Sequence, residues 1–244
     1  MPHINAVLRL REAELAKSTR VFLARGSKVK RCDRCLLPKT DCICAARPDV
    51  VSKSAFCFIM YTGECYKPSN TGRIIADVIA DNHAYVWDRT RPDAAMLALL
   101  NDSRYAPIVV FPQQYAEPER CINSPLELTA VQSGKIPLFI MLDGTWREAK
   151  KMFKSPYLAT LPVLGIQPEQ ASNYALREAA HLHQLCTAEV AIEVLKLAQD
   201  TAAASALAAV GRVTVAAPAE QSSGMGRSLP STSSGIIQEQ KLRV

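Results

Sequence analysis

An aspartate at the end of an apolar run is the residue in this chain best placed for chemistry. Residues 136–142 read IPLFIML, and Asp143 follows them directly. Such a run predicts a strand that is buried on both faces of a parallel sheet. Ligands of open α/β sheets bind at the carboxyl ends of the strands, which is where Asp143 is expected. A structural role stays open, because Thr145 and Glu148 also fit a capping box that starts a helix.

A basic helix is predicted directly after this aspartate. It begins near Trp146 and carries basic side chains whose spacing places them on one face: Arg147, Lys150, Lys151 and Lys154. A positive ridge beside a carboxylate suits an enzyme that acts on a phosphate backbone. The alternative is a helix whose lysines are simply solvated.

Four cysteines predict a small metal module. Cys32, Cys35, Cys42 and Cys44 follow the pattern C-x2-C-x6-C-x-C, which supplies a complete tetrahedral set of thiolates without a histidine. A site closed on all four sides indicates structural zinc that folds a segment too short to build its own core. An iron–sulfur cluster uses the same ligands, and a cluster of free thiols is the remaining alternative.

Two further segments place polar residues after predicted strands. Thr62 follows the first strand, and the polar segment over residues 62–73, which includes Asn70 and Arg73, leads into a helix. Phe111 and Pro112 end the third strand in the same way. Such loops hold small ligands through backbone and amide groups, although each of them is also compatible with an ordinary strand-to-helix connection.

The hydrophobic pattern predicts alternating strands and helices, as in a mostly parallel α/β sheet. Strands are expected at 55–61, 84–87, 108–111, 136–142 and 161–166, and helices at 71–80, 93–100, 126–132 and 145–153. Residues 175–209 predict one long helix or two, and one or two short amphipathic helices are expected in the first thirty residues.

Charge and composition divide the chain into four parts. Residues 1–31 hold eight basic and two acidic side chains, which is the whole formal excess of +6, so this arm either contacts a polyanion or is a solvated basic helix. We predict a basic arm at 1–31, a four-cysteine module at 32–51, a catalytic domain at 52–210 and a disordered tail rich in Ser, Gly, Pro and Gln at 211–244.

Composition also narrows the class of protein. No apolar stretch is long enough to cross a bilayer and no signal-peptide core is visible, so we expect a cytoplasmic protein with no membrane contact and no obligate protein partner. The ten glycines form neither G-x-G-x-x-G nor a Walker loop, which argues against an ordinary Rossmann dinucleotide fold or a phosphate-loop NTPase. His181 and His183 are two apart in a predicted helix and do not share a face for a metal.

The order of these motifs resembles the DTW-domain family. The family is named for the Asp-x-Thr-Trp motif, seen here as Asp143-Gly144-Thr145-Trp146. The cysteine module, the loop over 70–73, the end of the third strand and the segments 174–177 and 185–189 resemble the family in the same order. The resemblance covers roughly residues 30–200. One departure is Cys186, since the family usually has serine before the threonine at this point.

The resemblance implies a fold and an activity. Bacterial members are tRNA-uridine aminocarboxypropyltransferases with a SPOUT-like α/β fold and a knotted pocket for S-adenosylmethionine (SAM). They transfer the 3-amino-3-carboxypropyl group of SAM to N3 of a uridine in the tRNA variable loop and release methylthioadenosine. The implied co-substrate is therefore SAM, the implied partner is tRNA, and the implied metal is structural zinc.

The candidate site residues follow from this resemblance together with the sequence pattern. Asp143 is the candidate base, Thr145 orients the substrates, and Trp146 packs against a base or the adenine ring. The remaining candidates fall into two sets. The SAM site is assigned to Thr62, Phe111, Pro112, Leu142, Leu185 and Thr187, and RNA binding to Asn70, Arg73, Arg147, Lys150, Lys151 and Lys154.

Two other functions stay open at this stage. A SPOUT-type RNA methyltransferase would share the fold, SAM and the basic helix, but would produce S-adenosylhomocysteine. A non-catalytic RNA-binding protein would rely on the zinc module and the basic arm, and would have no affinity for SAM.

Overall fold

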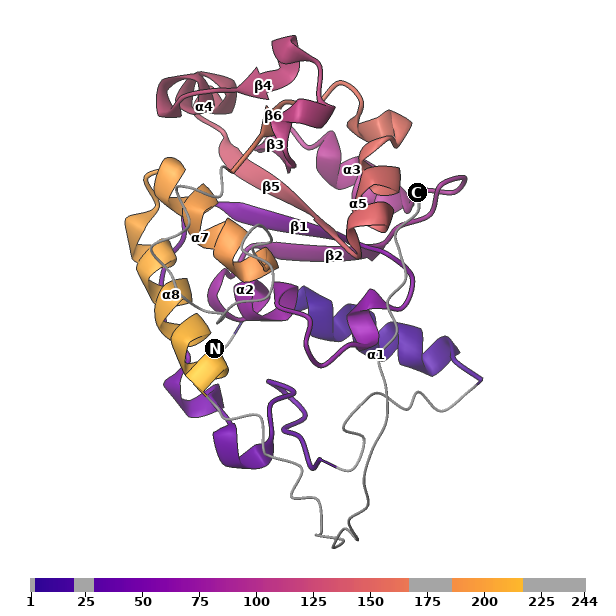
Figure 1. Cartoon of the computed structure of the whole chain (residues 1–244), viewed down its shortest axis with the longest axis vertical. Helices are drawn as coiled ribbons and strands as arrows, with labels where there is room; N and C mark the ends of the chain where they lie inside the picture. The colour runs from indigo at the N-terminus through magenta and orange to yellow at the C-terminus, as the bar shows by residue number, and fades with distance from the viewer. Residues whose placement is uncertain (1–2, 20–28, 167–185, 217–244) are drawn as a thin grey trace, which may run out of the picture.

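A six-stranded parallel sheet forms the centre of the protein (Figure 1). The computed structural model describes residues 3–19, 29–166 and 186–216. The strand order is β2-β1-β5-β3-β6-β4, and every pair of neighbours is parallel. The strands are β1 (Ala55–Met60), β2 (Asn82–Val86), β3 (Tyr105–Val110), β4 (Cys121–Ile122), β5 (Ile136–Asp143) and β6 (Val163–Leu164).

Helices cover both faces of this sheet. They are α1 (Ala6–Lys17), α2 (Gly72–Val78), α3 (Ala94–Leu100), α4 (Pro125–Gln132), α5 (Trp146–Phe153), α7 (Thr187–Leu197) and α8 (Thr201–Ala216). Short 3-10 turns lie at Lys39–Asp41, Cys44–Ala46, Glu64–Tyr66, Gln113–Tyr115, Pro118–Arg120 and Pro156–Leu158. Figure 1 shows α1, α2 and α8 on the lower side of the sheet, and α3 and α5 on the upper side.

The side chains of the central strands alternate between two apolar cores. Phe139 and Met141 of β5 belong to the core under α2, α7 and α8, whereas Leu138 and Ile140 belong to the core under α3 and α5. This alternation is the two-residue period of an extended strand. It places Asp143 on the side of α2 and α7, and Leu142 on the side of α5.

Most elements predicted from the sequence are confirmed. The mixed α/β class and the mostly parallel sheet are observed. The predicted caps are also present, because Ser124 Oγ accepts a hydrogen bond from the Glu127 amide and the Glu148 carboxylate accepts two from Thr145. Strand β4 was not predicted, since two residues are too few to show a period.

Of the two alternatives predicted near the carboxyl end, one long helix or two, the described residues show two helices. The segment 187–216 forms two helices, which are separated at Gln199 by a left-handed backbone with φ of 56°. Helix α8 continues to Ala216, beyond residue 210 where we ended the catalytic domain. The knot implied by the resemblance stays a prediction, because residues 167–185 between β6 and α7 lie outside the described residues. His181 and His183 lie in this segment too, so the prediction for them also stays untested.

The amino-terminal helix is fixed to the sheet by a buried asparagine. Asn5 caps α1, since its side-chain oxygen accepts a hydrogen bond from the Leu8 amide. The Asn5 amide nitrogen donates to the Arg73 carbonyl at 2.9 Å and to Asp77 Oδ1 at 2.6 Å. Arg47, which follows Cys44 within the cysteine module, forms an ion pair with the same Asp77 oxygen at 2.7 Å. The arm, the module and α2 therefore meet at one buried carboxylate.

None of the helices in the described part of the chain combines the length and apolar character needed to span a bilayer.

We predict that Asn5→Ala destabilises the protein by about 1–3 kcal/mol, because it removes a helix cap and leaves buried polar groups unpaired. Thermal unfolding measures the change. Asn101→Ala is the matched control, since Asn101 is exposed and its side chain only donates to the Leu97 carbonyl. Equal melting temperatures for the two variants would contradict the role of Asn5.

Candidate active site and metal centre

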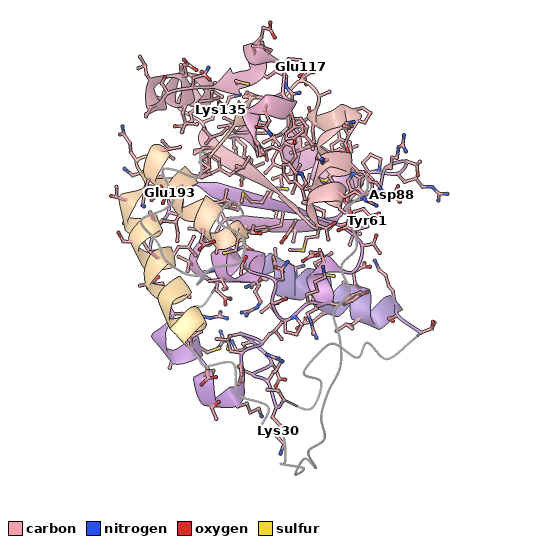
Figure 2. The ribbon with its side chains drawn as sticks, in the orientation of Figure 1. Lys30, Tyr61, Asp88, Glu117, Lys135 and Glu193 are labelled. Atoms are coloured by element: carbon pink, nitrogen blue, oxygen red, sulfur yellow. The ribbon has the colours of Figure 1, made fainter. Side chains whose placement is uncertain are left out.

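Asp143 lies at the carboxyl end of the central strand β5. It pairs with Met60 at the end of β1, and the Tyr61 amide donates to the Asp143 carbonyl at 2.9 Å. Figure 2 shows the two ends of the sheet, with Tyr61 at the carboxyl end and Lys135, which precedes β5, at the opposite end. The aspartate therefore occupies the sheet edge predicted from the sequence.

Two side chains from distant segments hold the Asp143 carboxylate. Asn70 Nδ2 donates to Oδ2 at 2.7 Å, and the Thr187 hydroxyl at the start of α7 donates to Oδ1 at 3.4 Å. The Asp143 side chain is buried, with 6% of the residue exposed. Both carboxylate oxygens thus have neutral donors, and the amino end of α7 adds a partial positive charge beside them.

The start of α2 packs directly against this carboxylate. A Cβ added to Gly72 would lie 2.9 Å from Asp143 Oδ2 and 3.2 Å from Asn70 Oδ1. Because real Cβ contacts are not that short, any side chain at residue 72 would displace the carboxylate or its partner. Thr71 links the two helix starts, since its hydroxyl oxygen accepts a hydrogen bond from the Ala188 amide at 3.4 Å.

Burial raises the pKa of Asp143 to about 6. The hydrogen bonds from Asn70 and Thr187 lower the pKa, because they stabilise the ionised form, whereas the negative charge of Glu64 raises it. Glu64 is itself buried and forms an ion pair with Lys67. A carboxyl group with a pKa near 6 can both accept and release a proton close to neutral pH.

An aromatic cluster occupies the other side of the same sheet edge. Phe111 follows β3 and stacks on Trp146 of α5, with ring centroids 5.4 Å apart and planes 14° apart. Phe111 also stacks on Phe153, with 4.4 Å between centroids. Phe111 and Phe153 belong to the core under α5, and Asp143 faces the core under α2. Trp146 therefore stacks on the α5 side of the sheet, and the role predicted for it beside Asp143 stays a prediction.

The remaining candidate residues take several positions. Thr145 is exposed and bonds to Glu148, so its visible role is to cap α5. Thr62 is exposed after β1, while Pro112 and Leu142 are half-buried at the ends of β3 and β5. Leu185 lies outside the described residues. Of the basic residues, Arg147, Lys151 and Lys154 are exposed, and Lys150 is half-buried beside the aromatic cluster.

The positions of Asn70 and Arg73 do not suit the RNA contacts that we predicted for them. Both are buried, with 5% and 3% exposed. Asn70 holds the Asp143 carboxylate, whereas the Arg73 guanidinium donates to the Pro68 carbonyl at 3.3 Å. The sequence placed both residues in a polar segment, but it could not show that Asn70 turns toward Asp143 or that Arg73 lies buried in the first turn of α2.

Two hollows among the described residues lie elsewhere. One, of about 290 Å³, lies between α1 and β2 and is lined by Arg9, Leu10 and His83. The other, of about 330 Å³, is lined by Arg120, Val131, Thr160 and their neighbours. Neither includes Asp143, whose surroundings are defined by the direct contacts above.

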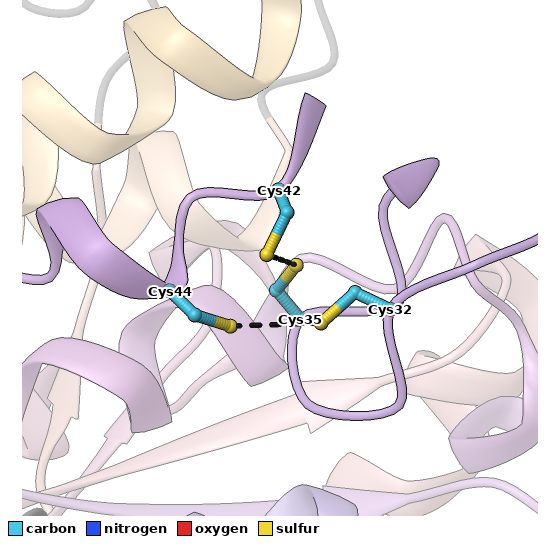
Figure 3. A group of neighbouring side chains, drawn as sticks. All are labelled: Cys32, Cys35, Cys42 and Cys44. Atoms are coloured by element: carbon cyan, nitrogen blue, oxygen red, sulfur yellow. Dashed lines mark hydrogen bonds between the residues drawn. The ribbon is translucent and has the colours of Figure 1, made fainter. Parts of the chain in front are cut away.

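The four predicted cysteines converge on one point (Figure 3). Their sulfur atoms all lie within 4.8 Å of one another, with 3.7 Å between the Cys32 and Cys44 sulfurs and 3.8 Å between those of Cys35 and Cys42. A tetrahedral zinc site with Zn–S bonds of about 2.3 Å requires sulfurs about 3.8 Å apart. The cluster therefore fits a four-coordinate metal, and these residues could hold zinc.

The electrostatics of the cluster are uneven. Hydrogen bonds from the Cys35 and Arg34 backbone amides lower the pKa of Cys32 to about 6. Burial raises the pKa of Cys44 to about 12 and also raises that of Cys35. A bound cation would favour the thiolate form at all four positions. Cys35 is fully buried in the core under α2, which connects the module to the main domain.

Comparison with known proteins assigns the family. A family model described as DTW domain matches residues 29–217, which is most of the chain. The chain belongs to the DTW-domain family. Its match begins just before Cys32 and ends just after helix α8, so it includes both the cysteine cluster and Asp143. Membership of this family is consistent with a tRNA-modifying enzyme. No solved structure matches the chain.

Several residues of this DTW domain were missed from the sequence alone. Gly72 and Thr71 complete the surroundings of Asp143, and Tyr115 joins the aromatic cluster. The first two belong to the motif over 70–73, whose glycine was a usable signal of a close approach. Tyr115 had no such signal, because it lies in a short turn without a repeating pattern.

We predict that Asp143→Asn stabilises the folded protein at pH 7.5 by roughly 1–3 kcal/mol, which follows from the raised pKa of the buried carboxyl. The folded pKa of about 6 lies above the ordinary aspartate pKa of 3.8, so the folded state binds the proton more tightly than the unfolded state. Wild-type stability should therefore fall as pH rises between these values, and stay lower above pH 6.

Thermal unfolding from pH 4 to 8 measures this difference, which should close toward pH 4. Asp49→Asn, at an exposed position, controls for the substitution itself. A stability gap that does not change with pH would contradict a buried, proton-linked carboxylate.

We also predict one equivalent of zinc in the isolated protein, lost in Cys35→Ser together with a fall in melting temperature. Elemental mass spectrometry measures the metal content. Cys121→Ser is the control and should keep the metal, since Cys121 contacts the Gln113 and Glu117 carbonyls and none of the other cysteines. Iron with visible absorbance in place of zinc would instead show an iron–sulfur cluster.

Proposed function

We propose that this protein is a tRNA-uridine aminocarboxypropyltransferase. It moves the 3-amino-3-carboxypropyl group of SAM to N3 of a uridine in the tRNA variable loop and releases methylthioadenosine. The observation that carries the proposal is the buried Asp143, with a pKa raised to about 6 and two neutral donors, in a chain of the DTW family.

The reaction needs a proton acceptor beside uridine. N3 of uridine carries a proton whose pKa is well above neutrality, so it attacks an alkyl carbon only as that proton leaves. In our proposal the Asp143 carboxylate takes the proton. The N3 electron pair forms the bond to the γ-carbon of the aminocarboxypropyl group, the bond from that carbon to sulfur breaks, and its electron pair stays on sulfur as a neutral thioether.

Asn70 and Thr187 position the carboxylate for this step. Each donates to a different oxygen, which fixes the plane of the carboxyl group. The choice between methyl and aminocarboxypropyl transfer is geometric, because only the carbon placed in line with N3 reacts. We assign the binding of SAM to the sheet edge around Thr62, Phe111, Pro112, Leu142, Leu185 and Thr187, within a SPOUT-like knotted fold.

The direct test uses SAM labelled in the aminocarboxypropyl group and an unmodified tRNA transcript. Nucleoside mass spectrometry should find the label on uridine, and methylthioadenosine should appear in equal amount. Formation of S-adenosylhomocysteine with a methylated nucleoside would instead show a methyltransferase. Binding of RNA without measurable affinity for SAM would show a non-catalytic RNA-binding protein.

We predict that Asp143→Asn lowers the rate of transfer by about 100-fold or more while leaving the affinity for SAM intact, because a general base contributes about 10²–10⁴. The wild-type rate should rise with pH as Asp143 ionises and level off above about pH 6. Asn70→Ala should move this midpoint upward, since it removes a hydrogen bond that stabilises the carboxylate.

Single-turnover rates from pH 5 to 8 measure both effects. Asn101→Ala is the matched control and should leave the pH profile unchanged. Near-normal turnover of Asp143→Asn would remove Asp143 as the base, and an unshifted midpoint in Asn70→Ala would remove Asn70 as its positioning residue.

A further inference from the structure

Two large aromatic side chains are exposed on the side of the sheet edge away from Asp143. Trp146, at the start of α5, is 42% exposed, and Tyr115, at the end of the turn after β3, is 41% exposed. Their rings meet nearly at right angles, at 70°, with centroids 5.4 Å apart. The two rings thus form a corner that is open to solvent.

This corner rests on a rigid support. Trp146 stacks on Phe111, which is buried and in turn stacks on Phe153. The three rings are almost parallel, with planes 14° and 16° apart at the two contacts. An exposed tryptophan on an aromatic base of this kind loses little conformational entropy when another flat ring packs on it.

A lysine places positive charge at the same corner. Lys150 Nζ lies 5.3 Å from the Trp146 ring centroid and 5.5 Å from that of Tyr115. Arg147, Lys151 and Lys154 on the same helix are exposed. Aromatic rings beside a row of basic residues form the usual combination for binding single-stranded nucleic acid, in which bases stack and the cations contact phosphates.

The charge favours RNA over SAM as the ligand of this corner. SAM at neutral pH carries a sulfonium, an ammonium and a carboxylate, so its net charge is +1 and the basic residues repel it. An RNA strand brings one negative phosphate with each base. Trp146 stacks on Phe111, which belongs to the core under α5, whereas the Asp143 side chain packs beside Gly72 of α2, so the corner and the carboxylate lie on different faces of the sheet.

We infer that Trp146, Tyr115 and Lys150 form a stacking site for an unpaired nucleobase of an RNA strand, separate from the base that reaches Asp143. The inference rests on the proposed function in one respect, namely that the RNA is a tRNA. Trp146 and Tyr115 supply the stacking surface, and Lys150 contacts the adjoining phosphate.

Tryptophan fluorescence tests the site without any turnover. The chain has two tryptophans, and Trp87→Phe leaves Trp146 as the single reporter. Unpaired oligoribonucleotides should quench this reporter, whereas SAM alone and duplex RNA of the same length should not. Quenching by SAM without RNA would show that the corner binds the adenine ring of SAM. Equal quenching by duplex RNA would show that the corner contacts phosphates and does not stack on an unpaired base. Either result overturns the inference.

Variants separate stacking from charge. Tyr115→Ala should weaken binding of the unpaired strand by about 5- to 100-fold, which is the range for loss of one stacking ring, and Tyr115→Phe should retain it. Lys150→Gln should reduce the slope of log affinity against log salt by about 0.7, as for one phosphate contact on a single strand. Lys135→Gln, at the other end of the sheet, is the control and should keep the slope.

The outcomes distinguish this inference from the proposed function. Quenching of Trp146 by unpaired RNA in a protein that transfers no group from SAM would keep the stacking site and reject the enzyme activity. Full transfer activity with wild-type RNA affinity in Tyr115→Ala would reject the stacking site and keep the enzyme.

Discussion

The carboxylate of Asp143 is buried among neutral donors, and three segments of the chain must meet correctly to satisfy it. A buried carboxylate without hydrogen bonds is costly, and its ionised form is more costly still. Strand β5 brings the acid, the turn before α2 brings Asn70, and the start of α7 brings Thr187. The parallel order of β1, β5 and β3 places these segments at one edge of the sheet.

The same arrangement explains why the carboxylate keeps an intermediate proton affinity. Its two hydrogen bonds and the amino end of α7 favour the anion, whereas burial and the charge of Glu64 oppose it. A more exposed aspartate would be fully ionised at neutral pH and a weaker base. A buried aspartate without hydrogen-bond donors would stay protonated. The close packing of Gly72 keeps the balance by excluding other groups from this side.

Some of this could be predicted from the sequence and some could not, for physical reasons. The continuous apolar run before Asp143 predicted β5, because a strand buried on both faces has no other pattern. The four cysteines were predicted as a cluster, since their spacing in the chain is short. The partners of Asp143 were not predicted, because Asn70 and Thr187 lie 73 and 44 residues away in sequence. Arg73 was wrongly predicted to be exposed, because charged side chains usually are, whereas it is buried in α2.

The junction of Asn5, Arg47 and Asp77 has a thermodynamic consequence. It joins the amino-terminal helix and the cysteine module to α2, the helix that starts with Gly72. A cation held by the four sulfurs would therefore also stabilise α2, the helix whose first residue packs against Asp143. Any such coupling is reciprocal, so the free energy by which a bound cation stabilises this end of α2 equals the free energy by which an intact α2 strengthens retention of the cation. The metal content of the protein would thus depend on the packing around Asp143, although the sulfurs do not contact that residue.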